Sequence, residues 1–137
     1  MILTDKAERV ILDSLFQSGG LYPTGKLALY STVNDSRESN PSSGVNIEIS
    51  GNGYARVNYS STTFSSASTD GNGKTTVENT GDIVFPTASG GDWPVATHLA
   101  VISGGNVIAF LQLDTSLQAL DGQQIKLLAG DLKIEAK

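Results

Sequence analysis

The single histidine, His98, is the side chain best suited to acid–base chemistry near neutral pH. Alone it cannot form a multi-histidine metal site, and as a general base it would need a nucleophile and an orienting carboxylate beside it. Asp82 and Asp92 are near it in the sequence, but their spacing does not indicate such an arrangement. We therefore expect no catalytic residue, and we expect His98 to lie at the start of a strand with its ring hydrogen-bonded to a loop.

The stretch Asp70-Gly71-Asn72-Gly73 carries oxygen atoms that suit a cation. A calcium loop of the EF-hand kind needs further acids at fixed offsets and a closing glutamate, whereas Lys74 follows here. Turn chemistry explains the stretch without a metal. The chain has no cysteine, and its glycines do not form a phosphate-binding loop before a helix. The sequence therefore predicts a protein that is not an enzyme and that binds no metal or cofactor.

The chain of 137 residues is acidic, with a net charge of -5, and its nine lysines and arginines are not clustered. Such a chain is a poor candidate for binding the phosphate backbone of a nucleic acid. Its N-terminus is charged where a signal peptide would be apolar, and no apolar run approaches the length that spans a membrane. We expect a single domain over residues 1–137, made in a cytoplasm, that binds neither nucleic acid nor membrane.

A β-hairpin is the best-defined element that would position these side chains. Two runs rich in Val, Ile, Leu and Phe, at 97–102 and 107–113, flank the turn Ser103-Gly104-Gly105-Asn106. In the second run, alternation places Val107, Ala109, Leu111 and Leu113 on one face and Ile108 and Phe110 on the other. Because both runs are apolar on both faces, the hairpin lies centrally under another layer, or else a second copy or another partner covers one face.

Residues 1–20 predict an amphipathic helix or arm before the sheet. Thr4 suits the N-cap position, and Gly19-Gly20 would end the helix. The apolar residues that recur at helical spacing are Leu3, Ala7, Val10, Ile11 and Leu15. We expect the helix to cover an open end of the sheet; the alternative is an arm that docks on a neighbouring subunit.

Residues 21–137 predict short strands separated by turns. The strands are expected at 26–31, 45–49, 54–59, 74–78, 82–86, 97–102, 107–113, around 125–127 and at 132–136. In the run 45–49 the alternation points Val45, Ile47 and Ile49 inward. The Ser/Thr-rich stretch 60–69 is expected to be extended and pinned by Phe64, and 32–44 is a long polar loop of the kind that often carries function. These elements predict a mainly β fold, an antiparallel β-sandwich or jelly-roll-like domain with one N-terminal helix.

An ordered set of short motifs runs through most of the chain. They are a helix from Ala7 to Phe16, then Gly53-Tyr54-Ala55-Arg56, Val84-Phe85-Pro86, Asp92-Trp93, Thr97-His98, Gly104-Gly105-Asn106, Asp121-Gly122 and Ala129-Gly130-Asp131-Leu132. In order and spacing this set resembles a widespread family of small virion structural proteins of tailed bacteriophages, often labelled tail-fibre-like. The chain departs from it at Pro94, where family members carry Gly, and at Tyr30-Ser31, which enters a polar loop in place of a short turn.

The resemblance implies a non-enzymatic component of a virion, synthesised in the host cytoplasm. We favour a capsid decoration (cement) protein that binds the outer shell and stabilises the contacts between capsomers, because the chain has no internal repeat or stem of the kind that long fibres need. The alternative is a tail or tail-fibre component that contacts the host surface, and a further alternative is a carbohydrate-binding module. The expected partners are the major capsid protein or tail proteins, together with further copies of the chain in a homotrimer.

Two sets of residues are assigned from these considerations. The residues expected to bind a partner are Ile2, Leu3, Asn34, Asp35, Arg37 and Asn40. The residues expected to be structural anchors are Tyr54, Arg56, Phe85, Trp93, His98 and Phe110. Among the anchors, Arg56 is expected to be partly buried beside a carboxylate such as Asp92 or Asp131, where a planar guanidinium pairs in a bidentate manner.

Overall fold

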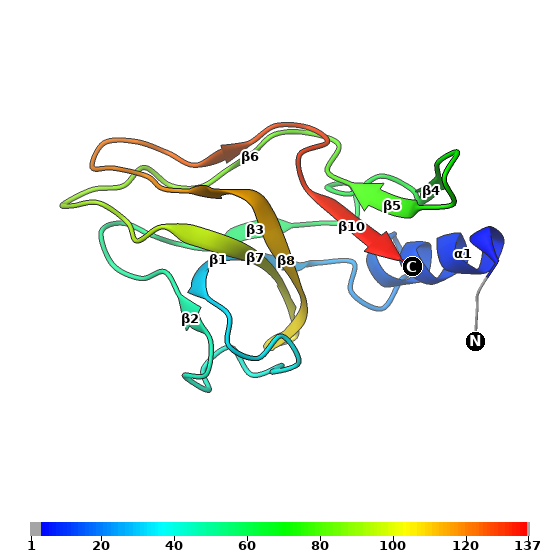
Figure 1. The fold of residues 1–137 in the computed structure, drawn as a ribbon, viewed down its shortest axis with the longest axis horizontal. Helices are drawn as coiled ribbons and strands as arrows, with labels where there is room; N and C mark the ends of the chain where they lie inside the picture. The colour runs from blue at the N-terminus through cyan, green and yellow to red at the C-terminus, as the bar shows by residue number, and fades with distance from the viewer. Residues whose placement is uncertain (1–3, 137) are drawn as a thin grey trace. The chain divides into compact units, whose positions relative to one another are not determined.

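The computed structural model describes residues 4–136, which form two compact units, each assembled from segments far apart in the sequence (Figure 1). The first unit contains residues 4–24, 59–83 and 127–136. The second unit contains residues 25–58 and 84–126. The single domain over 1–137 stays a prediction.

The first unit begins with the helix α1 (Asp5–Phe16), as predicted. The Thr4 hydroxyl accepts a hydrogen bond from the backbone N–H of Ala7 at 3.3 Å, which caps the N-terminus. At the other end the N–H of Gly20 donates to the carbonyl of Gln17 at 2.8 Å. These local contacts explain why the sequence located the helix correctly.

The buried face of α1 differs from the predicted one. Glu8, Leu12 and Phe16 are buried, whereas Val10 and Ile11 are 59% and 44% exposed. Both sets have helical spacing, so periodicity alone could not choose between them. The large Phe16 ring determines the buried face, because it packs against two other aromatic rings of this unit.

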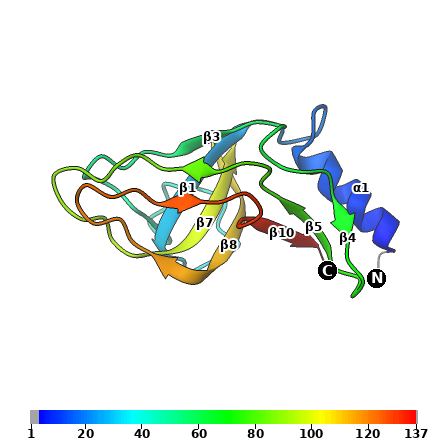
Figure 2. The ribbon, with the colours of Figure 1, turned by 90° about the horizontal axis from the view of Figure 1, so that it is seen from above.

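A three-stranded antiparallel sheet, with the order β10-β5-β4, lies beside α1 in the first unit (Figure 2). Its strands are β4 (Ser68–Thr69), β5 (Thr75–Glu78) and β10 (Lys133–Ala136). The helix contacts β5 and β4, and the buried Glu8 carboxylate accepts a hydrogen bond from the Thr75 hydroxyl at 2.8 Å. The helix therefore covers a sheet of its own chain.

Aromatic packing fills the interior of the first unit. Phe64 lies 5.2 Å from Phe16 and 5.4 Å from Tyr59, measured between ring centroids. Phe64 is buried and forms an isolated β-bridge with Asn79, so it pins the Ser/Thr-rich stretch as expected.

The second unit is built on a five-stranded sheet with the order β2-β1-β7-β8, in which β3 also pairs with β1. Its strands are β1 (Gly25–Thr32), β2 (Ile47–Glu48), β3 (Val57–Tyr59), β7 (Ala96–Ser103) and β8 (Asn106–Leu117). The printed pairings of β1 with β2 and β7, and of β7 with β8, are antiparallel. A separate two-stranded sheet pairs β6 (Ile83–Val84) with β9 (Lys126–Leu127). The mainly β, antiparallel fold with one helix is thus as predicted.

Both faces of β1 and β7 are buried within the chain, whereas the edge strand β8 is buried only at Val107 and is partly exposed from Ile108 to Leu111. One face carries Leu27, Leu29, Leu99 and Val101, and the other carries Ala28, Tyr30, Ala100, Ile102 and Val107, all of them buried. Val33 packs on the second set, and the carbonyl of Ser39 accepts the N–H of Val107 at 2.7 Å. The polar loop after β1 therefore helps to cover this face.

Strict alternation fails in β8 because of a β-bulge. The neighbouring residues Val101 and Ile102 of β7 pair with Ala109 and Val107 of β8. Ile108 therefore has no partner of its own in β7 and is the extra residue of the bulge. The bulge puts Val107 on the same side as Phe110, and both pack in one apolar cluster. The predicted separation of these two residues onto opposite faces is wrong for that reason.

The predicted inward direction of Val45 and Ile47 is also wrong. Both side chains are exposed, Ile47 by 52%, and only Ile49 of this run is buried. The pairing of β2 with β1 shifts register between Tyr30 and Thr32. Such an irregularity breaks the period of two on which the prediction depended.

Candidate partner-binding surface

The loop over residues 33–46 has a rigid internal scaffold centred on the buried side chain of Asn46. The Asn46 Oδ1 atom accepts the N–H groups of Asn34 at 2.7 Å and Asp35 at 2.9 Å. Its Nδ2 atom donates to the carbonyl of Asp35 at 2.8 Å. One buried amide thus satisfies three backbone groups, which fixes the start of the loop against its end.

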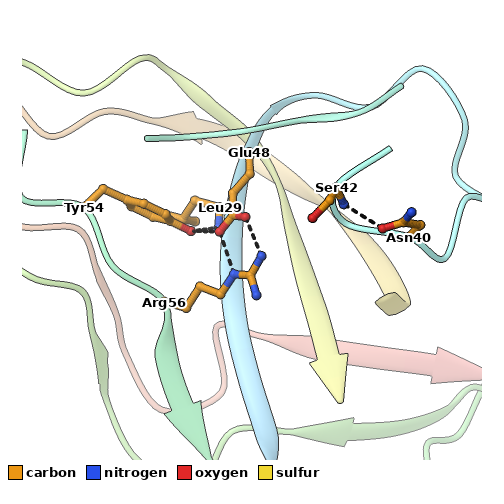
Figure 3. Close-up of polar contacts among 6 residues, drawn as sticks. All are labelled: Leu29, Asn40, Ser42, Glu48, Tyr54 and Arg56. Carbon is orange, nitrogen blue, oxygen red and sulfur yellow. Dashed lines mark hydrogen bonds and ion pairs between the residues drawn. The ribbon is translucent and has the colours of Figure 1, made fainter. Parts of the chain in front are cut away.

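Short side chains organise the outer part of the loop. Asp35 Oδ1 accepts the N–H of Arg37 at 2.9 Å, and Glu38 Oε1 accepts the N–H of Asn40 at 2.8 Å. Asn40 Oδ1 accepts the N–H of Ser42 at 2.9 Å (Figure 3). Each is a side-chain turn of the kind that Asp and Asn favour. The backbone is therefore held without contact with another molecule.

The loop contains four of the six residues expected to bind a partner. Asn34 and Asp35 belong to the scaffold, since the Asn34 side chain also donates to the carbonyl of Val45 at 2.9 Å. Arg37 and Asn40 are exposed; the Arg37 side chain is 92% exposed and lies 3.5 Å from Asp35 Oδ1. The other two expected residues, Ile2 and Leu3, lie outside the described residues.

Two exposed apolar side chains beside the loop were not expected from the sequence. Val45 comes directly before the scaffold residue Asn46, and Ile47 begins the edge strand β2. Together with Arg37 and Asn40 they define what we call the loop surface, residues 33–47. The only signal for them in the sequence was apolar alternation, and that signal placed them in the core.

A polar cluster lies at the end of this surface, where Glu48 pairs with two side chains from residues 54–56 (Figure 3). The Glu48 carboxylate accepts hydrogen bonds from Arg56 Nε at 2.9 Å and Arg56 Nη2 at 2.7 Å, and from the Tyr54 hydroxyl at 2.8 Å. The Tyr54 hydroxyl also accepts the N–H of Leu29 at 2.9 Å. Two segments are thereby fastened to β1.

Arg56 is partly buried and bidentate, but the expected carboxylate partners are wrong. Its partner is Glu48, not Asp92 or Asp131. Asp92 Oδ1 accepts the N–H of Asp121 at 2.8 Å, and Asp131 Oδ2 accepts the N–H of Leu128 at 2.8 Å. Asp131 therefore stabilises the turn before β10, beside Gly130. Asp92 instead joins its own loop to the distant residue Asp121.

The Tyr54 hydroxyl and the Arg56 guanidinium of this cluster stay protonated at neutral pH. Hydrogen bonding to Glu48 raises the pKa of the Arg56 guanidinium above its ordinary value. Burial raises the pKa of the Tyr54 hydroxyl far above its ordinary value, and the hydrogen bond from Leu29 only partly opposes this. Burial also raises the pKa of Tyr30, whose hydroxyl has no hydrogen-bond partner within residues 4–136. Groups with such pKa values do not exchange protons readily near pH 7, as a general acid or base must. Tyr54 and Arg56 instead stabilise the fold through their hydrogen bonds.

The remaining expected anchors lie in the second unit. Trp93 and Phe85 are buried, and Trp93 Nε1 donates to the carbonyl of Asn52 at 2.8 Å. Phe110 is half-buried and makes an edge contact with Tyr30 at a centroid distance of 5.1 Å. The half-buried His98 places Nδ1 at 2.8 Å from the hydroxyl of Thr97, its neighbour in β7, and not against a loop as expected.

Residues 4–136 hold no group of three or more His, Cys, Asp and Glu side chains that could bind a metal ion. Within this range, the structure has no helix with the length and hydrophobicity that crossing a membrane requires.

The family model described as podophage GP4 fiber I protein gp80 matches residues 3–135. No curated protein and no solved structure matches the chain.

Proposed function

Since the chain belongs to the family of podophage GP4 fiber I protein gp80, a phage virion structural protein, we propose that it is a fibre subunit with a purely structural role. The observation that carries this proposal is the extent of the family match, which covers residues 3–135 of a chain of 137. The description of the family supports the fibre role over the capsid decoration that the sequence alone favoured.

The loop surface is our candidate for the contact with a neighbouring virion protein. Its backbone is fixed by Asn46 and by three side-chain turns, so little conformational freedom remains to be lost on binding. It presents the exposed Arg37 and, at the other end of the same loop, two exposed aliphatic side chains, Val45 and Ile47. Apolar side chains with arginine at the edge are typical of protein–protein interfaces.

Binding of the chain to a virion protein through the loop surface is tested by measuring incorporation of a tagged chain into phage particles during infection. Arg37→Glu reverses a charge on the loop surface and is expected to reduce incorporation at unchanged melting temperature. The matched control is Lys133→Glu, which reverses an exposed charge on β10 that forms no ion pair within residues 4–136. Equal incorporation of both variants would show that the loop surface is not the contact. Absence of the unmodified chain from particles would refute the virion role itself.

Capsid decoration is the second candidate. The observation in its favour is that residues 4–136 contain no long stem, since the longest elements are a helix of 12 residues and a strand of 12 residues. The copy number of the chain in purified particles separates the two roles. A number comparable with that of the major capsid protein supports decoration, and one comparable with that of tail proteins supports a fibre.

We also propose that the chain associates with itself, as a homotrimer. The exposed Val10 and Ile11 on α1 support this, because apolar side chains on an outer helix face gain free energy when a second copy covers them. Sedimentation at high protein concentration tests the assembly, and a monomer under those conditions would contradict it.

A further inference from the structure

We propose that Asn72 is a site of spontaneous deamidation, at which the side-chain amide is converted to aspartate or isoaspartate. An asparagine followed by glycine is the most reactive pair for this chemistry, because glycine has no side chain to obstruct the ring closure. The chain contains two such pairs, Asn52-Gly53 and Asn72-Gly73. The structure distinguishes them.

Asn72 lies exposed in the turn that joins β4 to β5. Its side-chain amide forms no hydrogen bond with any residue in the range 4–136. The attacking atom, the backbone nitrogen of Gly73, has one hydrogen bond to give up, to the carbonyl of Asp70 at 3.2 Å, at the upper end of the usual range. A Cβ built on Gly73 would meet no atom within 4 Å, and residues 71–74 are all exposed, so no other part of the described chain packs against this side of the turn.

The reaction needs only water. The Gly73 nitrogen loses its proton to solvent and attacks Asn72 Cγ, so that an N–Cγ bond forms. The Cγ–Nδ2 bond then breaks, and the nitrogen leaves as ammonia after taking up a proton from solvent. Water opens the resulting five-membered imide at either carbonyl, which leaves a carboxylate at position 72. Because the nitrogen must first lose a proton, the rate rises with pH.

The second pair, Asn52-Gly53, is held in place on several sides. Asn52 Nδ2 donates to the carbonyl of Asp92 at 3.0 Å. The Asn52 carbonyl accepts hydrogen bonds from Ser89 N at 2.9 Å and from Trp93 Nε1 at 2.8 Å. A Cβ on Gly53 would lie 3.1 Å from the carbonyl of Thr87, so this backbone is closely packed. Ring closure would have to break these contacts, and Asn52 therefore keeps its amide in the folded chain.

Conversion at position 72 changes the turn itself. Asp70 Oδ1 accepts the N–H groups of Asn72 at 2.8 Å and Lys74 at 3.0 Å, which sets the spacing of the turn. Isoaspartate inserts one further carbon into the backbone between these two groups, and either product adds a negative charge beside Asp70. The modified turn is expected to loosen the pairing of Thr69 with Thr75.

The test is incubation of the folded, full-length chain at mildly alkaline pH, followed by peptide mapping with mass spectrometry that separates aspartate from isoaspartate. We expect product to accumulate at position 72 while Asn52 remains an amide. The chain incubated in denaturant is the control, where both sites are expected to react at similar rates. Asn72→Gln, which would have to close a larger ring, is expected to remove the product at this site.

Two results would overturn the proposal. One is an intact Asn72 in the folded chain after a period in which the denatured chain has reacted. The other is equal conversion of Asn52 and Asn72 in the folded chain, which would show that the structure does not control the reaction.

Discussion

Arg56 and Glu48 form the most consequential ion pair at the scale of single residues. Arg56→Lys keeps the charge but loses the planar pair of donors that reaches both carboxylate oxygens. Because both side chains are partly buried, we expect a loss of about 1 kcal/mol in the free energy of unfolding, measured by urea denaturation.

The matched control for this pair is Arg37→Ala. The Arg37 side chain is 92% exposed, so removing its ion pair with Asp35 is expected to change stability very little. A stability of Arg56→Lys equal to that of the unmodified chain would mean that Glu48 is well solvated without its bidentate partner.

The raised pKa of the Tyr54 hydroxyl predicts a loss of stability at alkaline pH. Burial raises its folded-state pKa above the value of about 10 for an unfolded chain. The folded chain therefore holds this proton more tightly, so the contribution to stability is fully present below about pH 10 and is lost as the pH rises further. Tyr30 contributes in the same direction.

Tyr54→Phe tests this dependence. Near pH 8 the variant is expected to lose about 1–2 kcal/mol, because Leu29 N–H loses its acceptor and Glu48 loses a donor. Above pH 10 the difference between variant and unmodified chain should shrink. A constant difference over this range, in urea denaturation at each pH, would show that Tyr54 does not titrate with folding.

The sequence identified several important residues but not their contacts. A partly buried ion pair was predicted for Arg56, but the expected partners, Asp92 and Asp131, were wrong. The actual partner is Glu48, which is positioned by the pairing of β2 with β1. The scaffold role of Asn46 gave no signal at all. An asparagine in a polar loop has the same appearance whether its amide is exposed or buried.

At the scale of elements, α1 offers a direct test of which face is buried. Leu12→Ala is expected to lower the free energy of unfolding by about 2–4 kcal/mol, because the buried side chain leaves a cavity. Its neighbour Ile11 is 44% exposed, and Ile11→Ala is expected to cost about 1 kcal/mol or less. The reverse order in thermal or urea denaturation would restore the face expected from the sequence.

Elements defined by local signals were predictable, and those defined by irregularities were not. Thr4, the helix between it and Gly19, and the Gly104-Gly105 turn with its two strands all follow from neighbouring residues. The bulge at Ile108 and the register shift beside Tyr30 arise from the fit between strands. Each shift reverses the side of every following residue, so the predicted faces of Val107 and Ile47 were wrong although their strands exist.

At the scale of the whole molecule, Asn79 joins segments that are distant in the sequence. Its buried side chain donates to the carbonyls of Gly81 at 2.8 Å and Leu128 at 2.9 Å and accepts the N–H of Leu132 at 2.9 Å. Asn79→Ala leaves these backbone groups without partners, and we expect a loss of about 2–4 kcal/mol.

Hydrogen exchange locates the effect of this substitution. Protection is expected to fall first in residues 128–136, including β10, which pairs with β5 directly before Asn79. Asn58→Ala is the control, because Asn58 is exposed. Unchanged protection in residues 128–136 would mean that strand pairing alone holds this segment.

Because the first unit is assembled from three separate segments, it cannot be completed until the last of them has been translated. Its helix α1 is translated first, its strands β4 and β5 emerge midway, and β10 comes last. Until residues 127–136 have been translated, β5 lacks its neighbour β10, and Leu12 and Phe16 lack the completed three-stranded sheet. A nascent chain that ends before β10 therefore cannot complete this unit, however much of its helix and of its other strands has formed.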